Sequence, residues 1–568
     1  MAAWSASRAI ARAAALATLC AAAAVTVPSA DAPRFRPDDP LRREVVSQDA
    51  SGVTRYEVDL SFDLLLNLFA TPGDPDLRRP AGNVNTLGEV PDGPWFVNRA
   101  GTIALDPEAV ARGPAETDGP APGRWTVIAA KSDGITPGFT IRDARGDTWF
   151  VKFDPPGWRG MATGAEAVAS RLLWALGYHV PEYHVVSLRP GNLDIAPDAE
   201  VDPPGARKRP MRHDDIARLL RSADREPDGS YRISASRAVA GTPVGGFRFF
   251  GTRPDDPNDI WPHEHRRELR GYGTFAAWLD HVDAKSQNTL DVLVRENGRA
   301  YVRHYLIDFG STLGSAAVMP REPWEGNEYL VDLPRLWRGI VGFGFPVPPW
   351  NTAPIVEAPA IGRLAASHDD WDPDAWKPRI PNPAFVHALP EDRFWAARKL
   401  AAITEAHVRA AIAAGHYDEA DAEALARALL QRRNAILRRY LPAVNPVVEP
   451  SLDATGRLSF VNAATAADVA PEPPAWHASF ARFDNATGTV TPIGEAQGPS
   501  SRIQAPGALP SETGSYVRVA IRAIDPERVE WDAPVYAFFR RETDGWALVG
   551  LERTSGTSPA ADATANGK

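Results

Sequence analysis

The sequence predicts an α+β protein, and three observations support this fold class. The stretch from 124 to 153 contains runs rich in β-branched and aromatic residues. Between 391 and 441, apolar residues recur at the 3.6-residue period of amphipathic helices. From 455 to 553, short segments alternate apolar and polar residues, as strands do. Substantial amounts of both helix and strand are therefore expected.

Length and composition narrow the class of protein. A chain of 568 residues is too long for one ordinary core, so two or three domains are expected. The 44% hydrophobic and 24% charged residues are typical of a globular protein, and 53 prolines with 44 glycines predict many loops. A formal net charge of -10 argues against a general nucleic-acid or anionic-membrane binder. Phosphate chemistry would therefore need local cations.

The first 32 residues predict a secretory signal, since Arg8 and Arg12 precede an apolar run that ends in small residues. Cleavage is expected after Ala30 or Ala32, which would place the protein in the periplasm or outside the cell. A short N-terminal anchor or a misassigned start is the alternative.

Cys20, the only cysteine, lies inside this predicted signal. Lipoprotein attachment at Cys20 is disfavoured because Leu19 stands where a small residue is normally required. The cleaved chain would contain no cysteine, which excludes disulfides, thiolate metal sites and a cysteine nucleophile. No later stretch is long and apolar enough to cross a bilayer.

The central part of the chain is expected to begin at 124, after an N-terminal extension at 33–123 that wraps on the larger domain. Its predicted elements, in order, are three strands within 124–153, a helix at 163–177, strands at 179–188 and 231–250 around a polar insert at 190–230, and a helical segment at 263–282. A hairpin follows at 289–310 and turns at Asn297-Gly298, a dipeptide suited to a tight turn. Antiparallel pairing of its arms would bring Asn288 and Asp308 close together.

The C-terminal part begins with two predicted helices, at 393–415 and 418–441. Residues 442–454 are interpreted as a linker because they contain several prolines. A small β-sandwich-like domain is expected at 455–553, followed by a disordered tail at 554–568. Residues 320–385 are rich in Pro and Trp and yield no prediction of secondary structure.

The stretch "HVDAKSQN" at 281–288, with "LIDFG" at 306–310, has the residue types that phosphoryl transfer requires. Asp283 could deprotonate an acceptor, and Lys285 could reach the transferring phosphate. Asn288 and Asp308 supply the oxygen ligands that magnesium prefers. His281 is expected to support the loop rather than to touch substrate. The alternative is a solvated polar loop followed by a turn.

The pattern H-x-D-x-K-x-x-N, followed by D-F-G, resembles the catalytic loop and metal-binding triplet of the protein-kinase-like superfamily. The helix sequence "EAVASRLLWALGYHVPEYHVV" is more similar to the HipA-type toxin kinases and to other atypical, lipid-kinase-like members. This resemblance implies a bilobal fold over 124–441, with a β-rich N-lobe and a mainly helical C-lobe. It also implies ATP as the donor, with Mg²⁺ or Mn²⁺. No clear A-P-E element follows the triplet, so substrate rules of protein kinases are not transferred.

Lys152, at the end of a predicted strand, and Glu166, in the next predicted helix, resemble the superfamily's phosphate-anchoring lysine and its glutamate partner. Each has a simpler explanation. A lysine at a strand end is usually solvated, and Thr163-x-x-Glu166 is also a capping box.

The segment "KSDGITPGF" at 131–139 would cover the phosphates, with Lys131, Ser132, Gly134 and Thr136 as candidate contacts. An ordinary hairpin turn explains it equally well.

Together these residues predict an exported, ATP- and magnesium-dependent phosphotransferase. An adenylyltransferase on the same fold and a catalytically inactive, kinase-fold binding module of the cell envelope remain as alternatives. The sequence contains no motif for the acceptor, which could be a protein, a lipid, a sugar or a small molecule. A zinc site at "HEH" (263–265) is disfavoured because its spacing differs from H-E-x-x-H.

Overall fold

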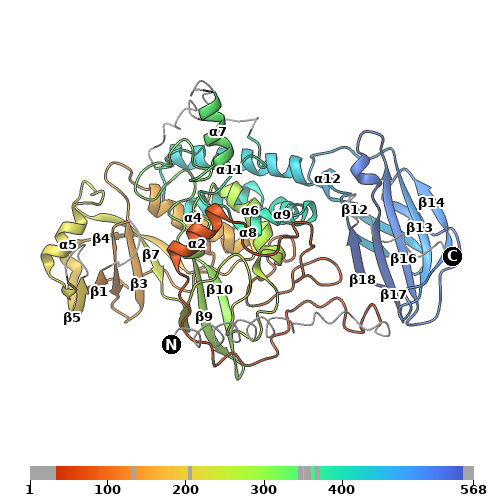
Figure 1. Cartoon of the computed structure of the whole chain (residues 1–568), viewed down its shortest axis with the longest axis horizontal. Helices are drawn as coiled ribbons and strands as arrows, with labels where there is room; N and C mark the ends of the chain where they lie inside the picture. The colour runs from red at the N-terminus through yellow and green to blue at the C-terminus, as the bar shows by residue number, and fades with distance from the viewer. Residues whose placement is uncertain are drawn as a thin grey trace, which may run out of the picture.

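The computed structural model describes residues 33–130, 136–201, 207–342, 350, 358, 360–364 and 371–553. The predicted signal at 1–32 with Cys20, the candidate contacts Lys131, Ser132 and Gly134, and the predicted tail at 554–568 lie outside the described residues. Within these ranges the chain forms both helices and several sheets, which confirms the α+β class (Figure 1). None of the helices among the described residues has the length and hydropathy needed to cross a membrane.

A seven-stranded sheet lies at one end of the molecule, in the order β4-β7-β3-β2-β1-β5-β6 (Figure 1). Its strands are β1 (Trp125–Ala130), β2 (Gly138–Arg142), β3 (Thr148–Phe153), β4 (Tyr183–Leu188), β5 (Leu193–Val201), β6 (Arg209–Pro210) and β7 (Tyr231–Arg237). Helix α4 (Met161–Leu176) packs against this sheet, and α5 (His213–Leu220) contributes Ile216 and Leu220 to the core of the sheet. The three strands predicted at 124–153 and the helix predicted at 163–177 are confirmed.

The prediction of a polar insert at 190–230 is wrong. This stretch contains β5, β6 and α5, and β5 pairs in parallel with β1. Few apolar residues of β5 are buried, namely Leu193, Ala196 and Ala199. Their spacing does not match the two-residue period of a regular strand, since the β1–β5 register shifts between Val127 and Ala129. The sequence pattern therefore could not indicate this strand.

The central part of the molecule consists of a three-stranded sheet, in the order β10-β9-β8, and a group of helices. The strands are β8 (Thr242–Gly245), β9 (Thr289–Glu296) and β10 (Arg299–Leu306), and β9 and β10 form the predicted hairpin around Asn297-Gly298. The helices are α6 (Arg267–Leu279), α7 (Leu333–Val341), α8 (Pro383–Val386), α9 (Pro390–Ala401), α10 (Glu405–Ala413) and α11 (Glu419–Tyr440), with short 3₁₀ turns η1 (Pro190–Asn192), η2 (His263–His265) and η3 (Ser286–Asn288) elsewhere in the chain.

The helix predicted at 393–415 is two helices, α9 and α10. Thr404 interrupts it, because its side chain accepts a hydrogen bond from the backbone N–H of His407 and so starts α10 as its N-cap. The apolar period continues through the break, since Ile403 is buried in the same core. Periodicity alone therefore could not reveal this boundary.

The C-terminal residues form two sheets at the other end of the molecule (Figure 1). One has the order β11-β12-β15 and the other β14-β13-β16-β17-β18. Their elements are β11 (Val447–Leu452), β12 (Arg457–Asn462), α12 (Ala463–Ala466), β13 (Ala475–Phe483), β14 (Val490–Gly498), β15 (Arg502–Gln504), β16 (Tyr516–Ile524), η5 (Val529–Asp532), β17 (Val535–Glu542) and β18 (Gly545–Arg553).

The linker predicted at 442–454 is wrong for its second half, which is strand β11. Pro450 suggested a linker, but β11 is an edge strand of its sheet and its pairing shifts between Val448 and Ser451. Proline is tolerated at edges and bulges of this kind. Val447 and Leu452 are buried in the same hydrophobic core as Leu437 of α11. The core therefore continues from the helices into the C-terminal sheets.

Residues 33–123 are mostly irregular, with α2 (Leu60–Phe69) and α3 (Pro107–Arg112) as their helices. They contact all three parts of the molecule. Phe35 packs against Phe483 and Phe538 of the C-terminal strands. The N–H of Ala50 donates to the carbonyl of Ala300 in the hairpin, and Val97 N–H donates to the carbonyl of Gly177 at the end of α4.

Candidate active site

Lys152 lies where the seven-stranded sheet, α4 and the hairpin meet. Its Nζ is 2.5 Å from Oε1 of Glu166 and 2.8 Å from Oδ1 of Asp308. Burial lowers the pKa of Lys152, but Asp308 and Glu166 outweigh this effect and raise the pKa above its ordinary value. The ammonium is therefore charged at neutral pH and is held between two carboxylates.

Helix α4 positions Glu166, and the capping-box explanation of this residue is wrong. The helix begins at Met161, and Asp154 accepts hydrogen bonds from the N–H groups of Gly160, Ala162 and Thr163 at 2.8, 3.0 and 2.9 Å. Glu166 instead lies 1% exposed beneath the site, and its Oε2 accepts the backbone N–H of Phe309 at 3.1 Å. Glu166 therefore contacts residues far from it in sequence and is not the capping residue of α4.

The hairpin brings the two predicted metal ligands to neighbouring positions. Thr289 pairs with Leu306 at its open end, and the N–H of Ile307 donates to the carbonyl of Asn288 at 3.0 Å. The next residue, Asp308, has φ = 60°, a left-handed conformation that aspartate tolerates better than most residues. The backbone N–H of Asp308 donates to the hydroxyl of Tyr183 at 3.2 Å.

The predicted catalytic loop places its polar side chains around Asp283. Lys285 Nζ is 2.8 Å and Arg379 Nη1 is 3.3 Å from Oδ1 of this carboxylate. Nδ2 of Asn288 donates to Oδ2 and to the backbone carbonyl of Asp283, at 3.0 and 2.7 Å. Because the amide nitrogen of Asn288 is engaged by Asp283, its oxygen Oδ1 is the atom left to coordinate a cation.

His281 is 1% exposed, as expected of a residue that supports the loop. Its Nδ1 lies 2.6 Å from the hydroxyl of Tyr272, and its ring centroid lies 5.9 Å from that of Phe309. Burial is the main cause that lowers the pKa of His281 to about 4, although Asp283 and Asp308 oppose it. The imidazole is therefore neutral at pH 7 and links the loop at 281–288 to the Asp308-Phe309-Gly310 triplet by packing.

A cavity of about 350 Å³ opens beside Lys152 and Asp308. Its walls are mainly apolar and come from the seven-stranded sheet, the connection after β7 and the hairpin. They include Phe139, Val151, Ala238, Val239, Leu290 and Ile307. The cavity therefore has the size and lining of a site for a small, largely apolar group.

The structure brings six of the ten predicted site residues into two contacting groups. Lys152, Glu166 and Asp308 form one, and Asp283, Lys285 and Asn288 form the other. Asn288 and Ile307 join the two groups through the backbone. Thr136 is described and buried, and it does not line this cavity, so its predicted phosphate contact stays a prediction.

Several residues of the site were not predicted. Arg379 lies in the stretch where the sequence gave no secondary structure, and Tyr183 belongs to a predicted strand without a distinctive motif. Ile307 and the connection after β7 could have been found from position alone. The first directly precedes the triplet, and the second follows the last strand of the seven-stranded sheet.

The donor set fits a magnesium ion. Asn288 Oδ1 and the Asp308 carboxylate are oxygen ligands, and magnesium usually takes one or two carboxylates together with the phosphates of a nucleotide. No cluster of three or more His, Cys, Asp or Glu suited to a metal occurs in the described parts of the chain.

Comparison with known proteins found no family model, no curated protein and no solved structure that matches the chain.

Proposed function

We propose that the protein is an ATP- and magnesium-dependent phosphotransferase with a bilobal, protein-kinase-like fold. The single observation that carries this proposal is the contact of Lys152 with both Glu166 and Asp308. These three residues come from a strand, a helix and the end of a hairpin. A solvated loop gives no reason for a lysine side chain, 16% exposed, that is held between two carboxylates. A phosphate anchor beside a metal ligand does give one.

In this proposal, the seven-stranded sheet with α4 is the N-lobe and the hairpin with the helices up to α11 is the C-lobe. The apolar cavity between them takes the adenine ring, with Leu290 and Ile307 on the hairpin side. Lys152 then meets the phosphates, and Glu166 holds its ammonium in place. The β-rich residues 455–553 form an appended β-sandwich-like unit.

The transfer step needs few covalent roles. The acceptor hydroxyl oxygen attacks the γ-phosphorus of ATP, the bond from that phosphorus to the oxygen of ADP breaks, and Asp283 receives the proton. Lys285, 2.8 Å from Asp283, is placed to contact the transferring phosphoryl oxygens. Asn288 and Asp308 would hold a magnesium ion, which neutralises charge on the phosphates.

Export of the chain through its first 32 residues is part of the same proposal. An exported enzyme would meet its acceptor outside the cytoplasm. A mature N-terminus at residue 31 or 33 in an extracytoplasmic fraction supports export. A full-length chain that stays in the cytoplasm contradicts it.

The proposal is tested with purified protein, radiolabelled γ-phosphate ATP and magnesium. We expect ATP to stabilise the protein against heat only when magnesium is present, and label to appear on an acceptor or in free phosphate. Asp283→Asn should retain ATP binding and lose turnover. Arg502→Ala, at an exposed position in β15, is the matched control and should behave as the parent. Absence of both stabilisation and turnover in the parent protein contradicts the proposal.

A further inference from the structure

A second cleft, with a volume of about 640 Å³, is lined by the connection after β7 and adjoins the candidate nucleotide cavity. The two share Pro181, Arg237, Ala238 and Val239 as wall residues. A volume of this size is typical of sites for small organic molecules. Nothing in the proposed phosphotransfer uses this cleft.

The cleft has one wall from each half of the molecule. Thr148 and Glu182 belong to the side of the seven-stranded sheet, and Leu293 and Tyr305 belong to the hairpin. Gly241, in the connection between the two halves, approaches the hairpin so closely that an added Cβ would lie 2.7 Å from the carbonyl of Leu293. A ligand in this cleft would therefore touch both halves and the connection between them.

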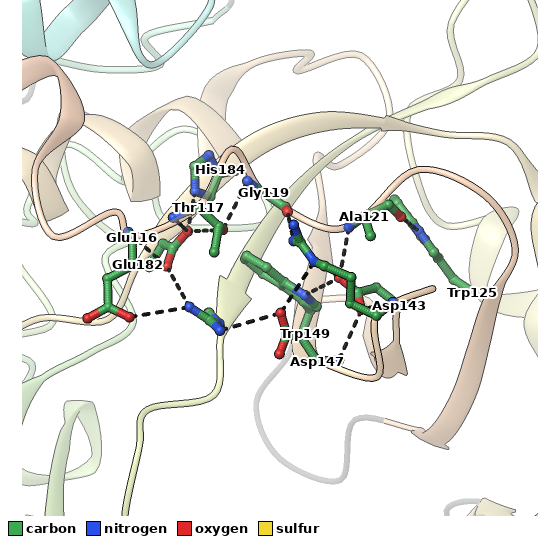
Figure 2. A network of polar contacts seen from close by, with 12 residues as sticks. Glu116, Thr117, Gly119, Ala121, Trp125, Asp143, Asp147, Trp149, Glu182 and His184 are labelled. Carbon is green, nitrogen blue, oxygen red and sulfur yellow. Dashed lines mark hydrogen bonds and ion pairs between the residues drawn. The ribbon is translucent and has the colours of Figure 1, made fainter.

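Most charges that line the cleft are paired with each other. Glu116, Asp147 and Glu182 surround Arg237 at 3.4, 3.4 and 3.5 Å (Figure 2). Arg303 is paired with Glu296 at 2.8 Å. Each of these carboxylates is therefore held by an arginine of the cleft.

Arg99 and Arg295 differ from the ion-paired arginines of the cleft. Within the described ranges, no carboxylate lies at ion-pair distance from either guanidinium. Arg99 stacks on Trp174, with its Cζ 4.6 Å from the ring centroid, and its Nη1 donates to the carbonyl oxygens of Trp174 and Tyr178 at 2.8 and 3.5 Å. Arg295 is exposed on β9. Asp92 acts electrostatically on Arg99, and Arg295 acts on Asp49, but neither arginine is held in an ion pair within the described residues.

Arg99 also has a structural role, because its bond to Trp174 caps the last turn of α4. That role uses only Nη1 and leaves Nε and Nη2 of the guanidinium as donors. A guanidinium group beside an indole ring suits an anion that also has an apolar or planar part. Burial lowers the pKa of Arg99 to about 10, only partly opposed by Asp92, so a bound anion would also relieve the desolvation of this charge.

We infer that this cleft is a second ligand site, for a small organic anion bearing phosphate or carboxylate groups, which Arg99 and Arg295 recognise. Because the ligand would bridge the two halves next to the shared wall, its binding is coupled to nucleotide binding. The coupling rests on the proposed function; the anion site does not.

The test is isothermal titration calorimetry of the purified protein with inorganic pyrophosphate and, separately, with citrate, both in EDTA. We expect saturable binding of at least one of them. The two probes distinguish phosphate from carboxylate as the preferred group. Lys152→Ala should bind as the parent does, which separates this cleft from the nucleotide cavity. No saturable binding of either probe overturns the inference, as does loss of binding in Lys152→Ala.

Arg295→Ala should weaken binding by roughly tenfold, since a hydrogen bond to a charged group is lost. Arg295 is exposed, so this variant should fold. Arg99→Gln, which removes the charge but retains a donor for the end of α4, should weaken binding further, whereas Arg502→Ala should not change it. Unchanged binding in both cleft variants overturns the inference. The coupling is checked by titrating ADP in EDTA with and without saturating anion; an unchanged ADP affinity contradicts the coupling alone.

Discussion

Lys152 and Glu166 form an ion pair with Nζ and Oε1 2.5 Å apart, and the glutamate is buried. Glu166 simultaneously accepts the backbone N–H of Phe309, next to Asp308. The same carboxylate thus fixes the side chain that would anchor phosphate and the backbone of the triplet that would hold the metal. Its position determines the geometry of both.

Glu166→Gln should separate the charge of this residue from its shape. The amide can still accept the Phe309 N–H but cannot pair with the Lys152 ammonium. We expect the free energy of unfolding to fall by about 2 kcal/mol, because a charge-assisted hydrogen bond is lost in a buried setting. Affinity for Mg-ATP should weaken roughly tenfold. Urea unfolding and calorimetry measure the two effects, and unchanged ATP affinity would show that Glu166 has only a structural role.

Asp308→Asn and Asp308→Ala should differ in stability but agree in function. Both remove the carboxylate, so both should abolish the magnesium dependence of ATP binding. Residue 308 has φ = 60°, which asparagine tolerates and alanine does not. The alanine variant should therefore be about 1 kcal/mol less stable than the asparagine variant. If both variants still need magnesium to bind ATP, Asp308 is not a metal ligand.

His281 should make stability depend on pH in the acid range. Its pKa is lowered from 6.5 to about 4 in the folded protein, first by burial and with Arg379 and Lys285 also disfavouring the cation. Below pH 6.5 the unfolded chain therefore binds a proton that the folded protein does not. Stability should fall as pH decreases from 6.5 to 4, by about 3 kcal/mol, and this loss should end once the folded imidazole is protonated.

His281→Asn isolates this contribution, because asparagine can still accept from the Tyr272 hydroxyl but does not titrate. The difference in unfolding free energy between parent and variant should shrink as pH falls from 7 to 4. A difference that stays constant over this range rules out the proposed protonation. Urea unfolding at matched ionic strength measures it.

Phe35→Ala should show that the N-terminal segment is part of the folded core. Phe35 is 3% exposed and its ring centroid lies 5.0 Å from that of Phe538. Truncation should cost about 3 kcal/mol, through lost transfer energy and the cavity left behind. Phe62→Ala is the matched control, since Phe62 is 53% exposed on α2 and its loss should change stability by about 0.5 kcal/mol or less. Equal effects of the two variants would contradict the packing of Phe35.

The regular elements could be predicted wherever local chemistry decides them. Asn297-Gly298 determines the hairpin turn, and the apolar period of 418–441 determines α11. β5 and the break before α10 could not be predicted in this way. The first is held by parallel pairing with β1, and the second by a single Thr404 cap within an unbroken apolar pattern.

The residues of the candidate site, too, could be predicted only where they lie close together in the sequence. Spacing alone placed Asp283, Lys285 and Asn288 on one loop, because three residues this close in sequence cannot lie far apart. The sequence could not decide whether Glu166 is the partner of Lys152 or part of a capping box with Thr163. The position of Asp154 at the start of α4 excludes the capping box. Spacing also gave no sign of Arg379, which reaches Asp283 from a stretch without a pattern.

The sequence by itself thus determined the α+β class, the hairpin that brings Asn288 near Asp308, and the residue types of the loop at 281–288. All three depend on interactions between residues close along the chain or on composition. Only the tertiary structure decided that Lys152 meets both Glu166 and Asp308, and that an apolar cavity opens beside them. These features depend on how a sheet, a helix and a hairpin pack together. Local patterns of side chains do not encode such packing.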